Sequence, residues 1–380
     1  MKKVGIICEY NPFHNGHIYH LEKIKEIFPD SLIILVMSGN YTMRGEISLL
    51  NKWDKTEISL NYGVDLVIEL PVFYATNSAD IFAEGSIKLL KELKCDYLVF
   101  GSESNDIKVL EQLANIQLNN QNYNQKVKEY LDKGLNYPTS MSKALNDLGG
   151  KDINSPNDLL GLSYIKEIIK QKANIIPLTI KRTNNYHEKS LNNDIASGTS
   201  IRNALDEGKD ISKVIPKETK EKIITNYQNN FFSLLKYQIL NNYDDLDKYL
   251  DVDEGLDNLI RKNIQKANNY RELINLIKTK RYTYNRLNRM FLHILLNVKK
   301  SDITKRKEIN YIKILGFTNN GKKYLKTLKN DTSIPIITNY SDIKDDNLTF
   351  ELNTSFIYHQ IINQQELNLK ELKSIPVHQK

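Results

Sequence analysis

The first half of the chain alternates short apolar runs with longer amphipathic stretches. The apolar runs have strand length and are continuous, which is typical of strands buried on both faces of a sheet. Helical spacing of the apolar residues between them predicts intervening helices. Strands are expected at 4–10, 32–39, 64–71, 95–102 and 173–182, and helices at 17–28, 51–62, 79–94, 125–133 and 157–171. Alternation of this kind predicts a parallel, doubly wound α/β sheet.

The pattern changes after about residue 215. Asn, Lys, Leu and Tyr become frequent, and the strand-like runs disappear. A helical stripe is formed by Leu287, Met290, Phe291, Ile294 and Leu295. We therefore expect an α/β domain over 1–215 and a mainly α-helical domain over 216–380, whose tail from about residue 333 returns to a small α/β element.

Composition narrows the class of protein. The chain has 380 residues, of which 40% are hydrophobic and 26% charged, so disordered, collagen-like and disulfide-scaffold classes are excluded. Cys8 and Cys95 lie inside apolar runs, which favours a reducing compartment and argues against structural zinc. No run has the length of a signal peptide core or a membrane span, so we expect a cytoplasmic protein without membrane contact.

The charge of the chain is segregated. Residues 261–329 carry nineteen Lys and Arg against three acidic residues, and since the net charge of the chain is +7, the remainder is acidic. A solvated face is one explanation. A surface that binds a polyanion is the other, and Tyr282, Tyr284 and Phe291 within the segment favour nucleic acid over membrane.

The strongest local signal is EYNPFHNGHIYHLEKI, directly after the first expected strand. Gly16 lets a ligand approach the backbone, the new helix offers free N–H groups, and His14 and His17 add donors to phosphate oxygens. This pattern predicts a nucleotide-activating site, although a plain turn at Pro12 and Gly16 is the alternative. His20 by itself reads as a helix-surface residue. The absence of a GxxxxGK[ST] motif disfavours phosphoryl transfer to a hydroxyl.

A second candidate is DIASGTSIRNALDEG, a loop that leads into a helix. Ser197, Thr199 and Ser200 can cap this helix and bind phosphate, and Arg202 can clamp the same anion. A plain cap with a solvated arginine is the alternative. This loop would supply positive charge to the leaving pyrophosphate of a nucleotide. Because a cluster of acidic metal ligands is then not needed, we expect no metal site built by the protein.

HNGH and SGTSIR together resemble the nucleotidyltransferase and class I aminoacyl-tRNA synthetase superfamily. Seven segments in order resemble the bacterial tRNA(Met) cytidine acetate ligases, from residue 4 to about 296. They are GIICEYNPFHNGHIYHL, MRGEISLLNKWDK with GVDLVIELP, FGSES, SPNDLLGLSYIK, PLTIKR with a following YH, ASGTSIR and KRYTYNRLNRMFLHILL. The chain departs from the family at Cys8, Gly198 and Ser163, where Val, Ala and Glu are usual.

The resemblance implies a nucleotidyltransferase-like domain that condenses acetate with ATP to acetyl-adenylate and pyrophosphate, without acetyl-CoA. The wobble cytidine of elongator tRNA(Met) then takes the acetyl group on N4, and AMP is released. Mg2+ is expected only on the nucleotide. The implied catalytic residues are His14, His17, Thr199, Ser200 and Arg202.

By matching position, the resemblance also implies the ATP contacts. They are Ile7, Cys8, Glu9, Tyr10, Asn11, Pro12, Phe13, His14, Asn15, Gly16, His17, Ile18, Tyr19, His20, Gly101, Asn157 and Arg182. Without the resemblance, Gly101 reads as a turn glycine, Asn157 as a helix cap and Arg182 as surface charge. Arg44 is a further candidate with no specific role.

For tRNA binding we expect phosphate contacts from two basic clusters. They are Arg281, Arg286 and Arg289, and Lys305, Arg306 and Lys307. Two other functions stay open on sequence alone. One is an adenylyltransferase for a small phosphorylated cofactor precursor, which does not need a basic domain, and the other is a non-catalytic RNA-binding protein.

Overall fold

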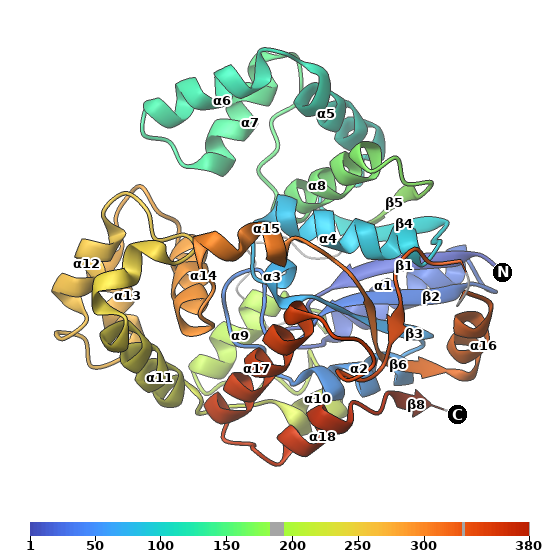
Figure 1. The fold of residues 1–380 in the computed structure, drawn as a ribbon. Helices are drawn as coiled ribbons and strands as arrows, with labels where there is room; N and C mark the ends of the chain where they lie inside the picture. Colours follow the sequence, from blue (N-terminus) through green and yellow to red (C-terminus); the bar gives the residue numbers. More distant parts are fainter. Residues whose placement is uncertain (183–193, 329–330, 380) are drawn as a thin grey trace.

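The computed structural model describes residues 1–182, 194–328 and 331–379 (Figure 1). Its centre is one sheet with the strand order β5-β4-β1-β2-β3-β6-β7, in which β8 also pairs with β6. The five strands of the first half are mutually parallel, and each overlaps a predicted strand. They are β1 (Lys3–Cys8), β2 (Leu32–Ser38), β3 (Leu66–Leu70), β4 (Tyr97–Ser102) and β5 (Ile176–Lys181). The predicted parallel α/β sheet is therefore confirmed.

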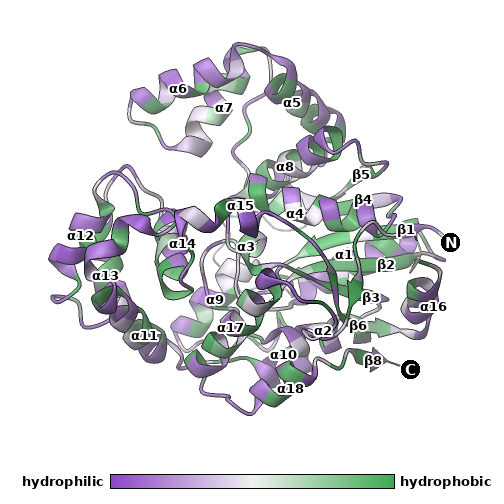
Figure 2. Cartoon of the chain, in the orientation of Figure 1, coloured by the Kyte–Doolittle hydropathy of each residue, from purple (hydrophilic) through white to green (hydrophobic). Residues whose placement is uncertain are grey.

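Helices cover both faces of this sheet because its strands are apolar on both sides (Figure 2). Along β2, Ile33 and Leu35 join one buried cluster with α1 and α2, whereas Ile34 and Val36 join the other with α4 and α8. The helices of this half are α1 (Asn15–Ile27), α2 (Lys52–Asn61), α3 (Val72–Ala75), α4 (Ala79–Glu92), α5 (Ile107–Asn119), α6 (Tyr123–Asp132), α7 (Tyr137–Asp147), α8 (Pro156–Lys170), α9 (Gly198–Asp206) and α10 (Lys217–Lys222).

Helices α3, α5 and α7 were not predicted. The expected helix at 125–133 is α6, but α5 and α7 flank it, and the three lie together above the sheet in Figure 1. Ser78 is the N-cap residue of α4, although its side chain makes no capping hydrogen bond.

The segment that follows is helical, as expected. It holds α11 (Gln228–Asn241), η1 (Tyr243–Lys248), α12 (Leu256–Asn263), α13 (Tyr270–Ile277), α14 (Tyr284–Leu295), η2 (Lys300–Asp302) and α15 (Ile303–Arg306). All five residues of the predicted stripe on α14 are buried. This stripe packs α14 into the core and leaves its polar side available to other contacts.

The sheet is completed by a strand that the sequence pattern did not reveal. β6 (Ile312–Thr318) runs antiparallel to β3 and places Phe317 opposite Leu66. Strand structure therefore resumes at β6, before residue 333, where the sequence predicted the return to an α/β element. It continues through α16 (Asn319–Leu328), β7 (Ile336–Ile337), α17 (Asp346–Ile361), α18 (Leu367–Lys373) and β8 (Val377–Gln379). Since residues on both sides of 215 share the sheet, the division into two domains there remains a prediction.

Strand β6 was not predicted because Lys313 interrupts its apolar run. This lysine nevertheless lies fully buried in the middle of the strand. Its Nζ lies 3.3 Å from Glu69 Oε2 on β3, and Lys52 Nζ on α2 lies 3.0 Å from Glu69 Oε1 and 2.6 Å from Glu371 Oε1 on α18. Buried charges are tolerated when they are paired in this way. The cluster joins the C-terminal segment to the parallel sheet.

No helix in the described ranges combines the length and the apolar character that crossing a bilayer requires.

Candidate active site

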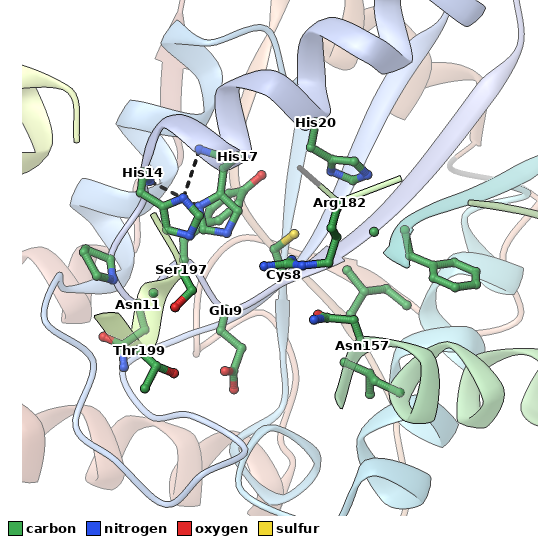
Figure 3. A pocket seen from close by; sticks show the side chains of 18 of the residues that line it. Cys8, Glu9, Asn11, His14, His17, His20, Asn157, Arg182, Ser197 and Thr199 are labelled. Carbon is green, nitrogen blue, oxygen red and sulfur yellow. Dashed lines mark hydrogen bonds between the residues drawn. The ribbon is translucent and has the colours of Figure 1, made fainter. Parts of the chain in front are cut away.

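A cavity of about 250 Å³ lies at the carboxyl ends of β1, β4 and β5 (Figure 3). The chain order of the sheet reverses between β1 and β4, which is where open α/β sheets bind ligands. Sixteen of the predicted site residues line it: Ile7, Cys8, Glu9, Tyr10, Asn11, Pro12, His14, Gly16, His17, Tyr19, His20, Gly101, Asn157, Arg182, Thr199 and Arg202.

Four predicted site residues do not line the cavity and instead support it. Phe13 is buried against Tyr10, and Ile18 packs on the same core cluster. Ser200 donates its N–H to the Ser197 hydroxyl, which forms the expected cap of α9. Asn15 donates to the carbonyls of Asp194 and Lys213, at 2.7 and 2.9 Å, and so ties α1 to the segments around α9.

The start of α1 fixes the tautomers of two histidines. The Gly16 N–H donates to His14 Nδ1 at 3.0 Å, and the His14 N–H donates to His17 Nδ1 at 3.2 Å. The two rings stack with centroids 3.7 Å apart. Because each Nδ1 accepts a hydrogen bond, each neutral ring carries its proton on Nε2. His14 and His17 therefore offer two Nε2–H donors to one bound anion.

Both imidazoles are uncharged at neutral pH. Burial, together with the positive charges of Arg182 and Arg202, lowers the pKa of His14 to about 3. Burial also holds the pKa of His17 well below its usual range. The pair thus provides hydrogen bonds rather than positive charge.

His20 belongs to the site, so its interpretation as a helix-surface residue is wrong. It lines the cavity, and its Nε2 is buried without a hydrogen-bond partner among the described residues. Burial and then Arg182 lower the pKa of His20 to about 4. Helical side chains lean toward the N-terminus of their helix, which brings a residue one turn inside α1 back to the strand end (Figure 3).

Arg202 reaches back from α9 to the loop after β1. Its Nη1 donates to the Asn11 carbonyl at 2.8 Å, its Nη2 donates to Thr199 Oγ1 at 3.4 Å, and its Nε lies 3.2 Å from Glu46 Oε2. A positive charge is thereby held beside the histidines at the start of two helices. This is the arrangement expected for binding a polyphosphate.

Arg182 and Asn157 share an acidic partner on the opposite side of the cavity. Asn157 Nδ2 donates to Glu103 Oε1 at 2.6 Å, and Arg182 Nε lies 3.9 Å from the same oxygen. Ser155 is the cap residue of α8, so Asn157 is not merely a helix cap. The following YH of the family resemblance, Tyr186 and His187, lies outside the described residues.

Sequence reasoning missed the apolar wall of the cavity. Phe82 on α4 and Leu160 and Tyr164 on α8 line it together with Phe100 on β4. Their place in apolar patterns indicated core residues, and only their position beside a strand end could have marked them as lining a site. The remaining lining residues are Met43, Arg44, Ile180, Lys181, Ile195, Ala196, Ser197 and Gly198.

The loop between β2 and α2 connects the cavity to α14. The Met43 N–H donates to Glu9 Oε1 at 2.6 Å, and the Met43 carbonyl accepts a hydrogen bond from Arg289 Nη1 at 3.3 Å. Gly45 has a φ of +74°, and a Cβ there would lie 2.3 Å from the Arg289 backbone nitrogen. The predicted tRNA contact Arg289 thus supports the active-site loop.

The other predicted tRNA contacts differ in exposure. Arg281 is exposed and lies 2.7 Å from Glu254, and Arg286 packs over the Tyr282 ring with Asp253 at 3.8 Å.

On α15, Lys305 is exposed and pairs with Asp346, whereas Arg306 donates to Asn347 Oδ1 at 2.9 Å and packs over the Phe350 ring. Lys307 is exposed. The basic segment 261–329 is not one surface, because Lys313 is buried and α16 lies at the opposite end of the molecule (Figure 1).

Comparisons with known proteins show the family of the chain. Residues 1–373 match the family model of the HIGH Nucleotidyl Transferases. The chain is 38% identical to the tRNA(Met) cytidine acetate ligase of Anoxybacillus flavithermus over 91% of both chains. It is 30% identical to Thermotoga maritima TmcAL, covering 100% of this chain and 99% of that one. The TM-scores are 0.91 for an apo crystal structure and 0.88 for one bound with alpha-thio ATP. The chain therefore belongs to the HIGH nucleotidyl transferases and, within them, to the tRNA(Met) cytidine acetate ligase family.

Proposed function

We propose that this chain activates acetate with ATP and transfers the acetyl group to N4 of the wobble cytidine of elongator tRNA(Met). The observation that carries the proposal is the pair of neutral histidines whose Nε2–H donors share a cavity with Arg182 and Arg202. Family membership supports the substrates. The roles that we propose for the predicted site residues follow from their contacts and belong to two half-reactions.

In the first half-reaction, an acetate oxygen attacks the α-phosphorus of ATP, and the bond to pyrophosphate breaks. The Nε2–H groups of His14 and His17 donate to the α-phosphate oxygens, which gain charge as the new bond forms. Arg202, with Thr199 beside it, neutralises the departing pyrophosphate. The apolar wall of Phe82, Phe100 and other side chains lies on the far side of the cavity and suits the adenine base.

In the second half-reaction, the cytidine amine attacks the acetyl carbon, and the bond to AMP breaks. The tRNA is held by positive charges at and beside α14 and α15 that reach the surface, which include Arg281, Arg286, Lys305 and Lys307. Arg289 and Arg306 contribute mainly by holding neighbouring segments in place.

We propose that Mg2+ enters on the nucleotide. Among the described residues, no group of three or more His, Cys, Asp or Glu side chains could hold a metal ion. A metal that arrives with ATP would neutralise part of the negative charge of its phosphates. We also propose a cytoplasmic location, where tRNA is made and where free thiols such as those of Cys8 and Cys95 persist.

The decisive experiment measures the two half-reactions separately. Acetate should stimulate exchange of labelled pyrophosphate into ATP without tRNA, and labelled acetate with ATP should acetylate a tRNA(Met) transcript. Acetyl-CoA without ATP should give no product. Exchange that depends on a phosphorylated cofactor precursor instead of acetate would identify an adenylyltransferase, and binding of tRNA without any exchange would identify a non-catalytic protein.

A further inference from the structure

Glu9 stands directly after β1 and lines the cavity from its floor. One carboxylate oxygen, Oε1, accepts the hydrogen bond from the Met43 N–H at 2.6 Å. No described residue donates a hydrogen bond to the other oxygen, Oε2. Figure 3 shows the carboxylate extending away from the three histidines, between Thr199 and Asn157. One oxygen thus fixes the group while the other stays available to a ligand.

This side of the cavity is connected to the helical region. The Met43 peptide that holds Glu9 is itself held by Arg289 of α14, through the Met43 carbonyl. Only the backbone of Met43, from its N–H to its carbonyl, therefore lies between the Glu9 carboxylate and Arg289 on the helix that we propose to bind tRNA. A nucleoside base presented from α14 would enter on the side of Glu9, opposite the histidines that hold the nucleotide phosphate.

The other lining groups are poor proton acceptors. His14 and His17 receive hydrogen bonds at Nδ1 and carry protons on Nε2, and the Nε2 atom of His20 is buried beside Arg182. Burial raises the pKa of the Cys8 thiol to about 12, so Cys8 stays protonated. The lysine and arginine side chains of the lining are hydrogen-bond donors in their charged forms and have no acceptor atom. Among the described lining residues, Glu9 carries the only carboxylate.

We propose that Glu9 is the general base of the acetyl-transfer step, an inference that rests on the proposed function. N4 of the cytidine forms a bond to the acetyl carbon, the bond from this carbon to the AMP phosphate oxygen breaks, and the N4 proton passes to Glu9 Oε2. The products are N4-acetylcytidine, AMP and a protonated Glu9, which returns its proton to solvent. No further reactant is required.

The surroundings suit this role. Burial raises the pKa of Glu9, and Glu46 raises it as well, whereas the Met43 N–H, Arg44 and Arg202 lower it. Lys55 also faces this turn, donating to the Glu9 carbonyl at 3.0 Å. A carboxyl whose pKa is moved toward neutrality is a stronger base than an ordinary surface carboxylate. The charges of Arg44 and Arg202 favour its ionised form.

The test is the variant Glu9→Gln in the full-length chain. The glutamine oxygen can still accept the Met43 N–H, but its amide cannot take a proton. Acetate-dependent pyrophosphate exchange, measured beside transfer, reports any effect of the variant on ATP and acetate, and transfer should fall far more than exchange does. Single-turnover transfer to tRNA(Met) should fall by about 100-fold or more, which is the usual contribution of a general base. Glu26→Gln, at an exposed position on α1, should leave both steps unchanged.

The pH profile provides a second readout. The transfer rate of the unmodified chain should rise with pH as Glu9 ionises and then level off, and this rise should disappear in Glu9→Gln. Transfer at the normal rate in the variant would overturn the proposal, as would a raised Mg2+ requirement for pyrophosphate exchange, which would make Glu9 a metal ligand. Absence of exchange in the unmodified chain would instead overturn the proposed function.

Discussion

At the scale of single residues, His17 combines two functions that one substitution can separate. Its Nδ1 accepts the His14 N–H at the start of α1, and we propose that its Nε2–H donates to the α-phosphate. His17→Ala should lose about 100- to 1,000-fold in pyrophosphate exchange, the usual effect of removing one such donor. The variant should also lose about 1 kcal/mol of stability, because the capping bond is gone.

His17→Gln is the matched control. A glutamine at this helix position can restore the bond to the His14 N–H. Its stability in urea should therefore be close to that of the unmodified chain, while exchange stays impaired. Both variants should bind tRNA with unchanged affinity. Equal loss of tRNA affinity and of exchange would show that His17 acts through the fold rather than on the phosphate.

The buried histidines also make the stability of the fold depend on pH in the acid range. Because the pKa of His20 is about 4 when folded and 6.5 is its ordinary value, the unfolded chain binds more protons within this window. The free energy of unfolding should therefore fall as pH drops from about 6.5 to 4, by up to about 1 kcal/mol per pH unit for this residue. Urea unfolding at pH 7 and pH 5 should show a smaller difference in His20→Gln. An identical difference would mean that His20 titrates normally.

At the scale of elements, the loop between β2 and α2 depends on one glycine. Gly45→Ala places a Cβ against the Arg289 backbone in a left-handed conformation, so it should cost about 1–3 kcal/mol and weaken the contact with α14. Gly134 has a similar φ of +83° but open space around it. Gly134→Ala should therefore cost only the backbone strain, about 1 kcal/mol. Equal losses in chemical unfolding would show that the contact with α14 does not matter.

The parallel sheet and the HNGH turn could be predicted because their information is local. Continuous apolar runs indicated all five parallel strands, and a glycine between histidines after a strand marked the nucleotide site. The expected helix start was correct to within two residues, since predicted 17–28 became α1 (Asn15–Ile27).

What could not be predicted depends on contacts between distant segments. β6 carries Lys313 in its centre, and only Glu69 and Glu371 make such a residue compatible with a core strand. The role of His20 depends on how α1 leans over the strand ends. Arg289 looked like a surface charge because Met43, its partner, lies far away in the sequence.

At the scale of the whole molecule, the buried charge cluster fixes the C-terminal segment to the sheet. Glu371→Ala leaves Lys52 and Lys313 short of a partner inside the core. Removing one member of a buried ion pair costs about 3–5 kcal/mol, and we expect a loss of this size in chemical unfolding. Glu366→Ala, an exposed glutamate nearby in sequence, should change stability by less than about 0.5 kcal/mol. Similar losses would mean that the cluster contributes no net stability.

The placement of positive charge gives a second prediction at this scale. Replacing Arg281, Arg286 and Lys307 by Gln should weaken tRNA binding and reduce its salt dependence by roughly 0.7 to 0.9 log units for each phosphate that is no longer neutralised. Pyrophosphate exchange without tRNA should be unaffected. The control replaces Lys322, Lys323 and Lys326, three exposed lysines on α16 at the opposite end of the molecule. A change in the salt dependence of this control alone would place the tRNA at the α16 end instead.

The antiparallel pairing of β6 with β3 also determines when the edge of the sheet is covered during synthesis of the chain. A ribosome delivers β3 early, but its partner strand emerges only after residue 318 has been synthesised. At about 5–20 residues per second, the edge of β3 stays uncovered for roughly 10 to 50 s. An uncovered edge strand is a template for pairing with other chains. Premature termination anywhere before β6 therefore leaves a product with an open sheet edge, and the nascent chain has a built-in interval during which chaperones must protect it.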